Sequence, residues 1–144
     1  MNKNKIKIIL VEDDPNDSQF IKLCLKKFVE PENFLHFENG ADILDFIFKK
    51  GKFVNRAEDA LPDLILLDLK TPKINGLEVL QKLKTDETTK SIPIVIITSS
   101  NEAKDLKYSY QYGANSFIVK PIDYEEFANT IESVGQYWVN VNQL

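Results

Sequence analysis

The chain has 144 residues, the length of one domain with a full hydrophobic core, and we expect residues 1–144 to form a single domain. With 43% apolar and 28% charged residues its composition is ordinary for a soluble globular protein, and the net charge of −4 argues against a nucleic-acid-binding protein, which usually carries a basic face. No apolar run approaches membrane-spanning length, and the single Cys24 excludes an internal disulfide, so the sequence favours a cytoplasmic location.

The N-terminal part of the chain begins with an apolar run followed by an amphipathic segment. Residues 6–11 predict a buried strand that ends at Glu12 and Asp13. Apolar residues at spacings of three and four then predict a helix from about residue 17 to residue 28. Cys24 lies on that apolar stripe and is therefore expected in the core.

A second, shorter strand is predicted at residues 34–37, followed by a turn and a helix whose apolar side ends near Phe48. His36 is the only histidine of the chain, and because one histidine cannot build a metal cluster we expect it to be structural. Residues 50–60 show no clear period and predict a loop that is longer than usual between such elements.

The segment from residue 61 to residue 77 contains the strongest signal. Its apolar residues 64–67, bounded by turn residues, predict a strand buried on both faces, and Asp68 follows where that strand gives way to a loop containing Asn75 and Gly76. Ligands of open α/β sheets bind at the carboxyl ends of the strands, so a carboxylate there is accessible and can act as a nucleophile. Taken alone, Asp68 is equally compatible with an ordinary strand-ending aspartate.

The C-terminal half repeats the alternation, beginning with a short helix over residues 77–83. Residues 92–97 predict a strand that ends at Thr98, and residues 117–119 predict a strand that ends at Lys120. Both strand ends therefore carry a polar side chain at the edge of the sheet where Asp68 is expected.

Capping residues and a glycine mark the ends of the last two predicted helices. Ser99 or Ser100 is placed to cap the fourth helix, which should stop at Gly113, and Asp123 with Glu126 resembles a capping box for the fifth. The side chains expected to face the core are Ala103, Leu106 and Tyr110 on the fourth helix, and Phe127, Ile131, Val134 and Trp138 on the fifth.

Five predicted strands thus alternate with five predicted helices. That pattern indicates an α/β protein with a doubly wound parallel sheet, right-handed crossovers and helices on both faces. Neither an internal repeat nor a low-complexity segment interrupts it.

The polar residues at the predicted strand ends suggest a common chemistry. Glu12, Asp13 and Asp68 would repel one another at one edge of the sheet unless a cation compensates their charge. Oxygen ligands without cysteine or a second histidine favour Mg²⁺ over zinc. A carboxylate nucleophile beside Mg²⁺, with the ammonium of Lys120 and the hydroxyl of Thr98 nearby, suits phosphoryl transfer.

Along nearly its whole length the chain resembles the receiver domain of two-component response regulators. The matching stretches are residues 10–13, residues 62–68, Pro72 with Gly76, residues 96–99 and residues 113–121. Each stretch alone is weak, and their specificity comes from all five occurring in order at the ends of the predicted strands. The resemblance implies the flavodoxin-like receiver fold, with five parallel strands in the order 2-1-3-4-5.

The resemblance also implies a phosphorylation site and its metal ligands. Asp68 would accept a phosphoryl group from a sensor histidine kinase. Asp13 would be the principal Mg²⁺ ligand with Glu12 in support, and Asp68 with the backbone carbonyl of Lys70 would complete the protein ligands. The protein would be a phosphoacceptor in signalling and not an enzyme acting on a separate substrate.

The family assigns roles to the remaining strand-end residues as well. Lys120 would pair with Asp68 and then with the phosphoryl group, Thr98 would bond that group and move, and Phe117 would occupy the switch aromatic position, often held by Tyr. The Lys120–Pro121 bond is usually cis in the family, as X–Pro bonds can be. Two positions that tune phosphoryl lifetime in the family carry Lys70 and Ser100 here.

The resemblance further suggests partners. The chain ends soon after its last predicted helix, so we expect a stand-alone receiver, and the long loop before the third strand together with the aromatic C-terminal segment resembles the regulators that partner bacterial phytochromes. Aromatic residues on the fourth helix and after the fifth suggest a homodimer built from the fourth helix, fifth strand and fifth helix.

Other functions remain open at this stage. A receiver-like module that binds partners without phosphorylation would keep the fold but need not keep the acid, Thr98 and Lys120 together. A haloacid-dehalogenase-type phosphatase also uses a strand-end aspartate and Mg²⁺, but usually has a second Asp where this chain has Lys70. An FMN carrier would need a first loop that cradles phosphate, which Glu12, Asp13 and Asp14 would repel. Asp14 itself falls outside the predicted metal-binding pair.

Overall fold

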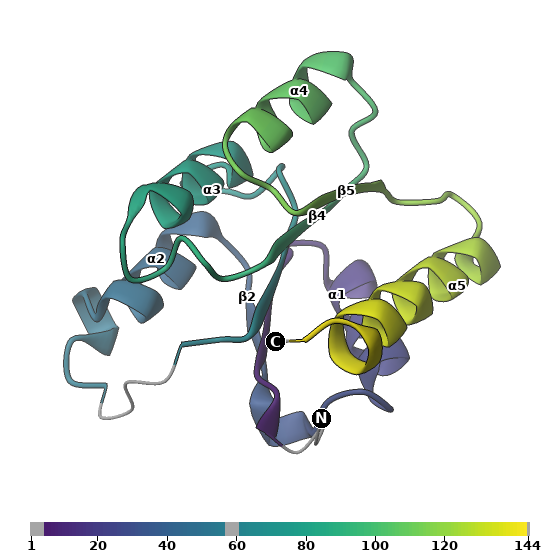
Figure 1. The fold of residues 1–144 in the computed structure, drawn as a ribbon, viewed down its shortest axis with the longest axis horizontal. Helices are drawn as coiled ribbons and strands as arrows, with labels where there is room; N and C mark the ends of the chain where they lie inside the picture. Colours follow the sequence, from purple (N-terminus) through teal and green to yellow (C-terminus); the bar gives the residue numbers. More distant parts are fainter. Residues whose placement is uncertain (1–4, 57–60, 144) are drawn as a thin grey trace.

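The structure, a computed structural model, describes residues 5–56 and 61–143 and contains a five-stranded parallel sheet with helices on both faces (Figure 1). The strands are β1 (Ile8–Val11), β2 (Phe34–Phe37), β3 (Leu64–Leu67), β4 (Ile94–Thr98) and β5 (Ser116–Val119). The helices are α1 (Pro15–Leu25), α2 (Gly40–Phe48), α3 (Gly76–Thr85), α4 (Ala103–Gln111) and α5 (Tyr124–Gly135). The strand order β2-β1-β3-β4-β5 confirms the predicted fold class.

The central strands are buried on both faces, as their uninterrupted apolar sequences predict. Every residue of β1 and β3 is buried, and Ile9 pairs in parallel with Ile65. Alternate side chains point to opposite faces of the sheet, so two separate apolar cores form. One core packs under α1 and α5, and the other under α2 and α3, as the two sides of the ribbon show (Figure 1).

Four of the five helices begin with a side-chain cap directly after the carboxyl end of a strand or its loop. The capping residues are Asp14, Asn39, Asn75 and Asp123, and each side chain accepts a hydrogen bond from a backbone N–H two or three residues later. The predicted cap at Asp123 is thereby confirmed. Asp14 places the start of α1 at Pro15, before the predicted start at residue 17, because the cap and Pro15 define the first turn and the apolar stripe begins only later.

The prediction for the buried face of α4 is wrong. Leu106 is 43% and Tyr110 is 51% exposed, and Ala103 is exposed as well. The buried residue of α4 is Ser109, whose hydroxyl has no hydrogen-bond partner within residues 5–56 and 61–143. β5, the strand that α4 contacts, is itself half-exposed, so α4 has no deep apolar surface on which to place its larger side chains.

The C-terminal segment departs from the predicted helical register. Phe127, Ile131 and Val134 of α5 are buried as predicted, but the next apolar side chain in the core is that of Val139, and Trp138 is only partly buried. The reason is a π-helix, Gln136–Val141, that continues α5. Its wider turn brings the residue five positions after Val134 to the core in place of the residue four positions later.

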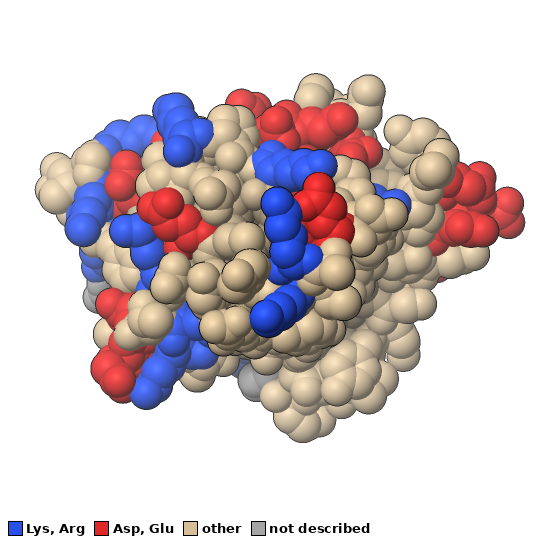
Figure 2. Space-filling model, turned by 90° about the horizontal axis from the view of Figure 1, so that it is seen from above, with Lys and Arg blue, Asp and Glu red and all other residues tan. Residues whose placement is uncertain are grey.

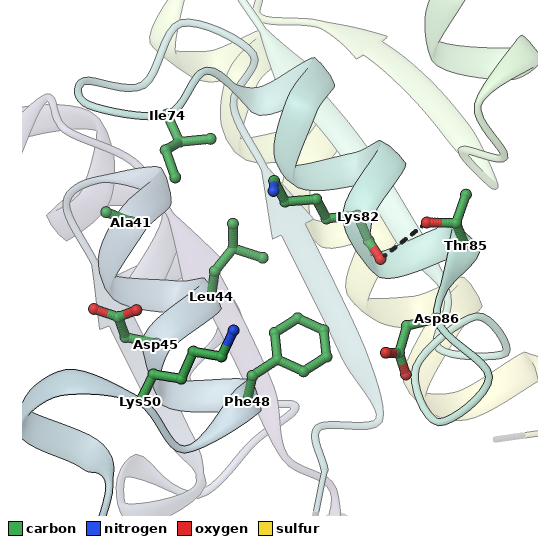
Figure 3. A pocket seen from close by; sticks show the side chains of 9 residues that line it. All are labelled: Ala41, Leu44, Asp45, Phe48, Lys50, Ile74, Lys82, Thr85 and Asp86. Atoms are coloured by element: carbon green, nitrogen blue, oxygen red, sulfur yellow. Dashed lines mark hydrogen bonds between the residues drawn. The ribbon is translucent and has the colours of Figure 1, made fainter.

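Two further features complete the fold. The predicted loop at residues 50–60 contains a 3₁₀ turn, Gly51–Phe53, and its residues 57–60 lie outside the described part of the chain. A cavity of about 460 Å³ opens between α2 and α3, with Leu44 and Phe48 facing it and Lys50 and Lys82 beside it (Figure 3). In the part of the chain that the structure describes, no helix is both long and apolar enough to cross a membrane.

Candidate functional site

The backbone brings the predicted strand-end residues to one edge of the sheet. Parallel pairing continues past the strands, because Glu12 N–H donates to the Phe37 carbonyl at 3.0 Å, and Asp68 N–H donates to the Val11 carbonyl at 3.1 Å. On the other side of the sheet, Lys120 N–H donates to the Thr98 carbonyl at 2.8 Å. These bonds extend the ladder by one residue and hold the functional side chains in register.

The ammonium of Lys120 is the centre of the site. Its Nζ lies 2.5 Å from Glu12 Oε1, 2.9 Å from Asp17 Oδ2 and 3.0 Å from Asp68 Oδ2. The Lys120 side chain is 9% exposed, and Glu12 and Asp68 are buried. Since an ammonium has three N–H donors, each carboxylate receives one of them.

The remaining oxygens of the two buried carboxylates accept from backbone amides of the loops. Asp68 Oδ1 accepts from Lys70 N–H at 3.1 Å, and Glu12 Oε2 accepts from Asp14 N–H at 3.2 Å. Both carboxylates are therefore oriented from two sides, and a buried charge is stable only when it is paired and hydrogen-bonded in this way.

The surroundings raise the pKa of both Glu12 and Lys120. For Glu12 this disfavours the charged form, and for Lys120 it favours the charged form. Burial raises the pKa of the Glu12 carboxyl to about 7, with repulsion by Asp68 adding to it and the hydrogen bond from Lys120 opposing it. Burial acts to lower the pKa of Lys120, but the bond to Glu12, the charge of Asp68 and the bond to Asp17 outweigh it and raise that pKa above its ordinary value. Lys120 therefore stays cationic, and the Glu12 carboxyl loses its proton at a higher pH than an ordinary glutamate does.

Glu12 and Asp68 also form a cluster with Asp13 that fits a divalent cation. Glu12, Asp13 and Asp68 each offer a carboxylate oxygen, and these oxygens lie within 4.8 Å of one another. Asp13 is exposed, so the cluster opens to solvent on its side. An all-oxygen donor set with room for water is the kind that Mg²⁺ takes, so the residues present fit the predicted metal.

Thr98 and Phe117 lie on the two strands beside Asp68. Thr98 is fully buried, and its Oγ1 accepts from Ser100 N–H at 3.3 Å. Ser100 is also buried, and its hydroxyl donates a hydrogen bond to Asp105 in α4. The N-cap residue of α4 is Glu102, which makes no side-chain capping bond, so the prediction that Ser99 or Ser100 caps this helix is wrong. Phe117 is partly buried against the core on the α2 and α3 side, and its N–H donates to the Tyr110 hydroxyl at 3.2 Å. The loop after β4 and the strand β5 are therefore each hydrogen-bonded to α4.

The turn behind Asp68 requires a glycine. A Cβ at Gly76 would lie 2.5 Å from the Asp68 carbonyl oxygen and 2.5 Å from Leu69 Cα, and Gly76 N–H donates to the Leu69 carbonyl at 2.8 Å. The close approach of these two backbone segments fixes the path of the chain on leaving Asp68.

The predicted residues Glu12, Asp13, Asp68 and Lys120 lie together, with one correction and one addition to the prediction. The Lys120–Pro121 bond is trans and not cis, and Lys120 still reaches Asp68 from the trans backbone. Asp14 caps α1, in keeping with its exclusion from the metal ligands. His36 is structural as expected, with Nε2 bonded to the Glu12 carbonyl at 2.7 Å.

The addition is Asp17, which the sequence analysis missed. A signal was present, because Asp17 falls in the first turn of the helix that follows the first acidic strand end, and first turns start at the carboxyl edge of a parallel sheet. The prediction took site residues only from the strand ends and therefore left Asp17 out.

Seen from above, one face of the molecule carries both acidic and basic side chains, which lie among uncharged residues (Figure 2).

The parallel sheet with this acid, hydroxyl and lysine set defines a class of protein. Residues 8–132 match the response regulator receiver domain, so the chain belongs to that family of two-component signalling proteins. Among similar sequences, the response regulator Rcp1 of Synechocystis sp. is 30% identical over 132 residues, which cover 92% of this chain and 88% of that protein. The probable methanogenesis regulatory protein FilR2 of Methanothrix harundinacea is 30% identical and covers 94% and 85%.

Solved structures show the same relation. The phosphorylated cyanobacterial phytochrome response regulator RcpA superposes with a TM-score of 0.89 at 31% identity, covering 96% of this chain and 97% of that one. The bacteriophytochrome response regulator AtBRR superposes with a TM-score of 0.74 at 35% identity, covering 97% and 96%. A structure of Rcp1 is of its Mn²⁺-bound form, with a TM-score of 0.89 at 29% identity, covering 96% and 98%.

Proposed function

We propose that this chain is a response regulator in which Asp68 accepts a phosphoryl group from a sensor histidine kinase, with Mg²⁺ bound beside it. The observation that carries the proposal is the position of Asp68, a buried carboxylate at a strand end. Asp68 forms an ion pair with Lys120 and belongs to a carboxylate cluster suited to a divalent cation. We further propose that residues 1–144 act as a single receiver domain in the cytoplasm.

The chemistry is transfer of a phosphoryl group between two nucleophiles. A carboxylate oxygen of Asp68 forms the new bond to phosphorus as the bond from phosphorus to the kinase histidine nitrogen breaks and leaves its electron pair on that nitrogen. Lys120 donates to the phosphoryl oxygens, and the buried hydroxyl of Thr98 donates to another of them. Bound Mg²⁺ supplies neutralisation of the charge on those oxygens.

A direct experiment tests the acceptor. Incubation of the protein with acetyl phosphate and Mg²⁺ should add one phosphoryl group by intact mass, and peptide mapping after reduction with borohydride should place it at Asp68. Omitting Mg²⁺ should suppress the adduct. A protein that stays unmodified under these conditions, with its cognate kinase as well, is a binding module that works without phosphorylation.

We propose that Mg²⁺ is held by Glu12, Asp13, Asp68 and the backbone carbonyl of Lys70. A ligand that binds only the folded state stabilises it, by about 1.4 kcal/mol at ten times its dissociation constant. Millimolar Mg²⁺ should therefore raise the melting temperature of the wild type by a few degrees and that of Asp13→Asn by much less. Asp14→Asn, which keeps the cap of α1, is the matched control and should respond like the wild type. An equal shift in Asp13→Asn and wild type would remove Asp13 from the ligands.

The signal is proposed to leave the site through Thr98 and Phe117. Thr98 moves toward the phosphoryl group, and Phe117 changes its packing in the space that Thr98 vacates. The link from Phe117 N–H to the Tyr110 hydroxyl connects this movement to α4, in which Ser109 is the one buried residue. Partner binding would then change on the face made by α4, β5 and α5.

The same face is the proposed homodimer interface. A phytochrome-type histidine kinase is the proposed phosphodonor, because the phytochrome response regulator RcpA and the bacteriophytochrome response regulator AtBRR share the fold of this chain. Exposed apolar residues lie on this face, among them Leu106, Tyr110, Val119 and Ile122, which is fully exposed. Sedimentation with beryllofluoride and Mg²⁺ should show a larger dimer fraction than sedimentation without them. A monomer in both states well above micromolar concentration would leave this face to another partner.

A further inference from the structure

Lys120 makes a third ion pair that the transfer chemistry does not use. Its partners Glu12 and Asp68 are, respectively, a proposed metal ligand and the proposed acceptor, whereas Asp17 is neither. The carboxylate oxygens that cluster within 4.8 Å in the described part of the chain come from Glu12, Asp13 and Asp68, without Asp17. Asp17 thus touches the site only through the ammonium of Lys120.

The position of Asp17 in the fold is well defined. It lies in the first turn of α1, where its own N–H donates to Asp14 Oδ1 at 3.2 Å, so its backbone is held by the helix cap. A carboxylate is favourable at a helix N-terminus, so the first turn of α1 is a suitable place for the Asp17 side chain. Its side chain is 21% exposed, against 9% for Lys120, which places Asp17 on the solvent side of the ion pair.

We propose that Asp17 is a positioning residue that holds the third N–H of Lys120 and gives it up when a phosphoryl group arrives. The ammonium has three donors, and all three are taken in the resting protein. An incoming phosphoryl oxygen must therefore displace one of them. Asp17 is the partner whose loss disturbs neither the acceptor nor the proposed metal ligands. This inference rests on the proposed function of Asp68.

Charge gives the direction of the effect. A phosphoryl group brings negative charge to a site where Asp17 already competes for the one ammonium. Replacing Asp17 with asparagine keeps the shape and removes the charge, so Lys120 is freed for the phosphoryl oxygens. Beryllofluoride, a phosphoryl mimic, should bind Asp17→Asn more tightly than wild type, by roughly three- to tenfold for one charge at a partly exposed site.

The matched control is Asp14→Asn. It makes the same charge change three residues away, keeps the cap of α1, and alters a carboxylate that does not contact Lys120. Beryllofluoride affinity with Mg²⁺, measured by calorimetry, should be unchanged in Asp14→Asn and increased in Asp17→Asn. In a Lys120→Met background the Asp17→Asn substitution should no longer change the affinity. An equal effect in both asparagine variants, or weaker binding by Asp17→Asn, overturns the proposal.

A metal-free measurement separates this inference from the proposed function. Thermal unfolding in EDTA of wild type, Asp17→Asn, Lys120→Met and the double variant forms a double-mutant cycle. The two shifts in melting temperature should be non-additive, because each substitution removes the same ion pair. Additive shifts overturn the inference whatever the phosphorylation result. A wild type that binds no beryllofluoride and takes no phosphoryl group, with non-additive shifts, contradicts the function of Asp68 alone.

Discussion

Asp68→Asn is expected to abolish the phosphoryl adduct that forms with acetyl phosphate and Mg²⁺. The amide keeps the size of the carboxylate and its hydrogen bond from Lys70 N–H, but it lacks the charge and nucleophilicity that attack on phosphorus requires. Intact-mass spectrometry over the time in which the wild type reaches full labelling measures the effect. The neighbouring carboxylates, Glu12 and Asp13, are not expected to substitute for it, because Lys120 and the cluster are arranged around Asp68.

The matched control for this experiment is Asp63→Asn. Asp63 precedes the same strand at its opposite end, where its carboxylate accepts from Lys7 N–H at 2.9 Å. The chemical change is identical, and the distance along β3 separates it from the site. Asp63→Asn should label like the wild type. Labelling of Asp68→Asn to the wild-type level would place the acceptor on another residue.

Lys120→Met is expected to cost about 3–5 kcal/mol of unfolding free energy in EDTA at pH 8, the usual loss when one partner of a buried ion pair is removed. Methionine fills the space of the lysine stem, so the loss comes from charge: Glu12 and Asp68 remain buried without the ammonium that pairs them. Urea unfolding measures it. Millimolar Mg²⁺ should restore part of the loss, because the cation compensates the same carboxylates.

The cost of Lys120→Met should depend on pH. Burial already raises the pKa of Glu12 to about 7 in the presence of Lys120, and removal of the ammonium raises it further. In the folded variant Glu12 therefore binds a proton more tightly than in the unfolded chain, and stability falls as pH rises. The loss should be smaller at pH 5 than at pH 8.

An exposed ion pair is the control. Lys90 pairs with Glu87 at 2.8 Å, and their side chains are 51% and 84% exposed. Lys90→Met should cost less than about 1 kcal/mol, since solvent screens such a pair. If Lys120→Met costs no more than Lys90→Met, or if its cost does not change with pH, the buried charges are compensated by groups other than Lys120.

Several features of this protein were predictable because they depend on local sequence. The apolar runs predicted the strands, since a strand buried on both faces must be apolar throughout, as β1 and β3 are. Alternation with helices then required a parallel sheet, and parallel strands bring their carboxyl ends to one edge. Glu12, Asp68 and Lys120 could be expected there together, although they are far apart in the chain.

The local pattern was less informative for helices that pack loosely. On α4 the spacing of Leu106 and Tyr110 predicted a buried stripe, but a helix buries only the face for which a partner surface exists. The half-exposed β5 offers little such surface, and the residue that α4 buries is Ser109. After α5, the π-helix shifts the buried position from Trp138 to Val139, and a period of 3.6 residues cannot predict that shift.

The sequence by itself therefore determined the strands, the class of fold and the acidic edge. Hydrophobic periodicity indicates where the strands lie, and the geometry of a parallel sheet brings their carboxyl ends to one edge. Only the tertiary structure decided which charges share Lys120. The contact between Asp17 and Lys120 joins residues 103 positions apart and depends on how the first turn of α1 is set by its cap against the end of β5. Such a contact is a consequence of packing between elements, and no spacing in the sequence specifies it.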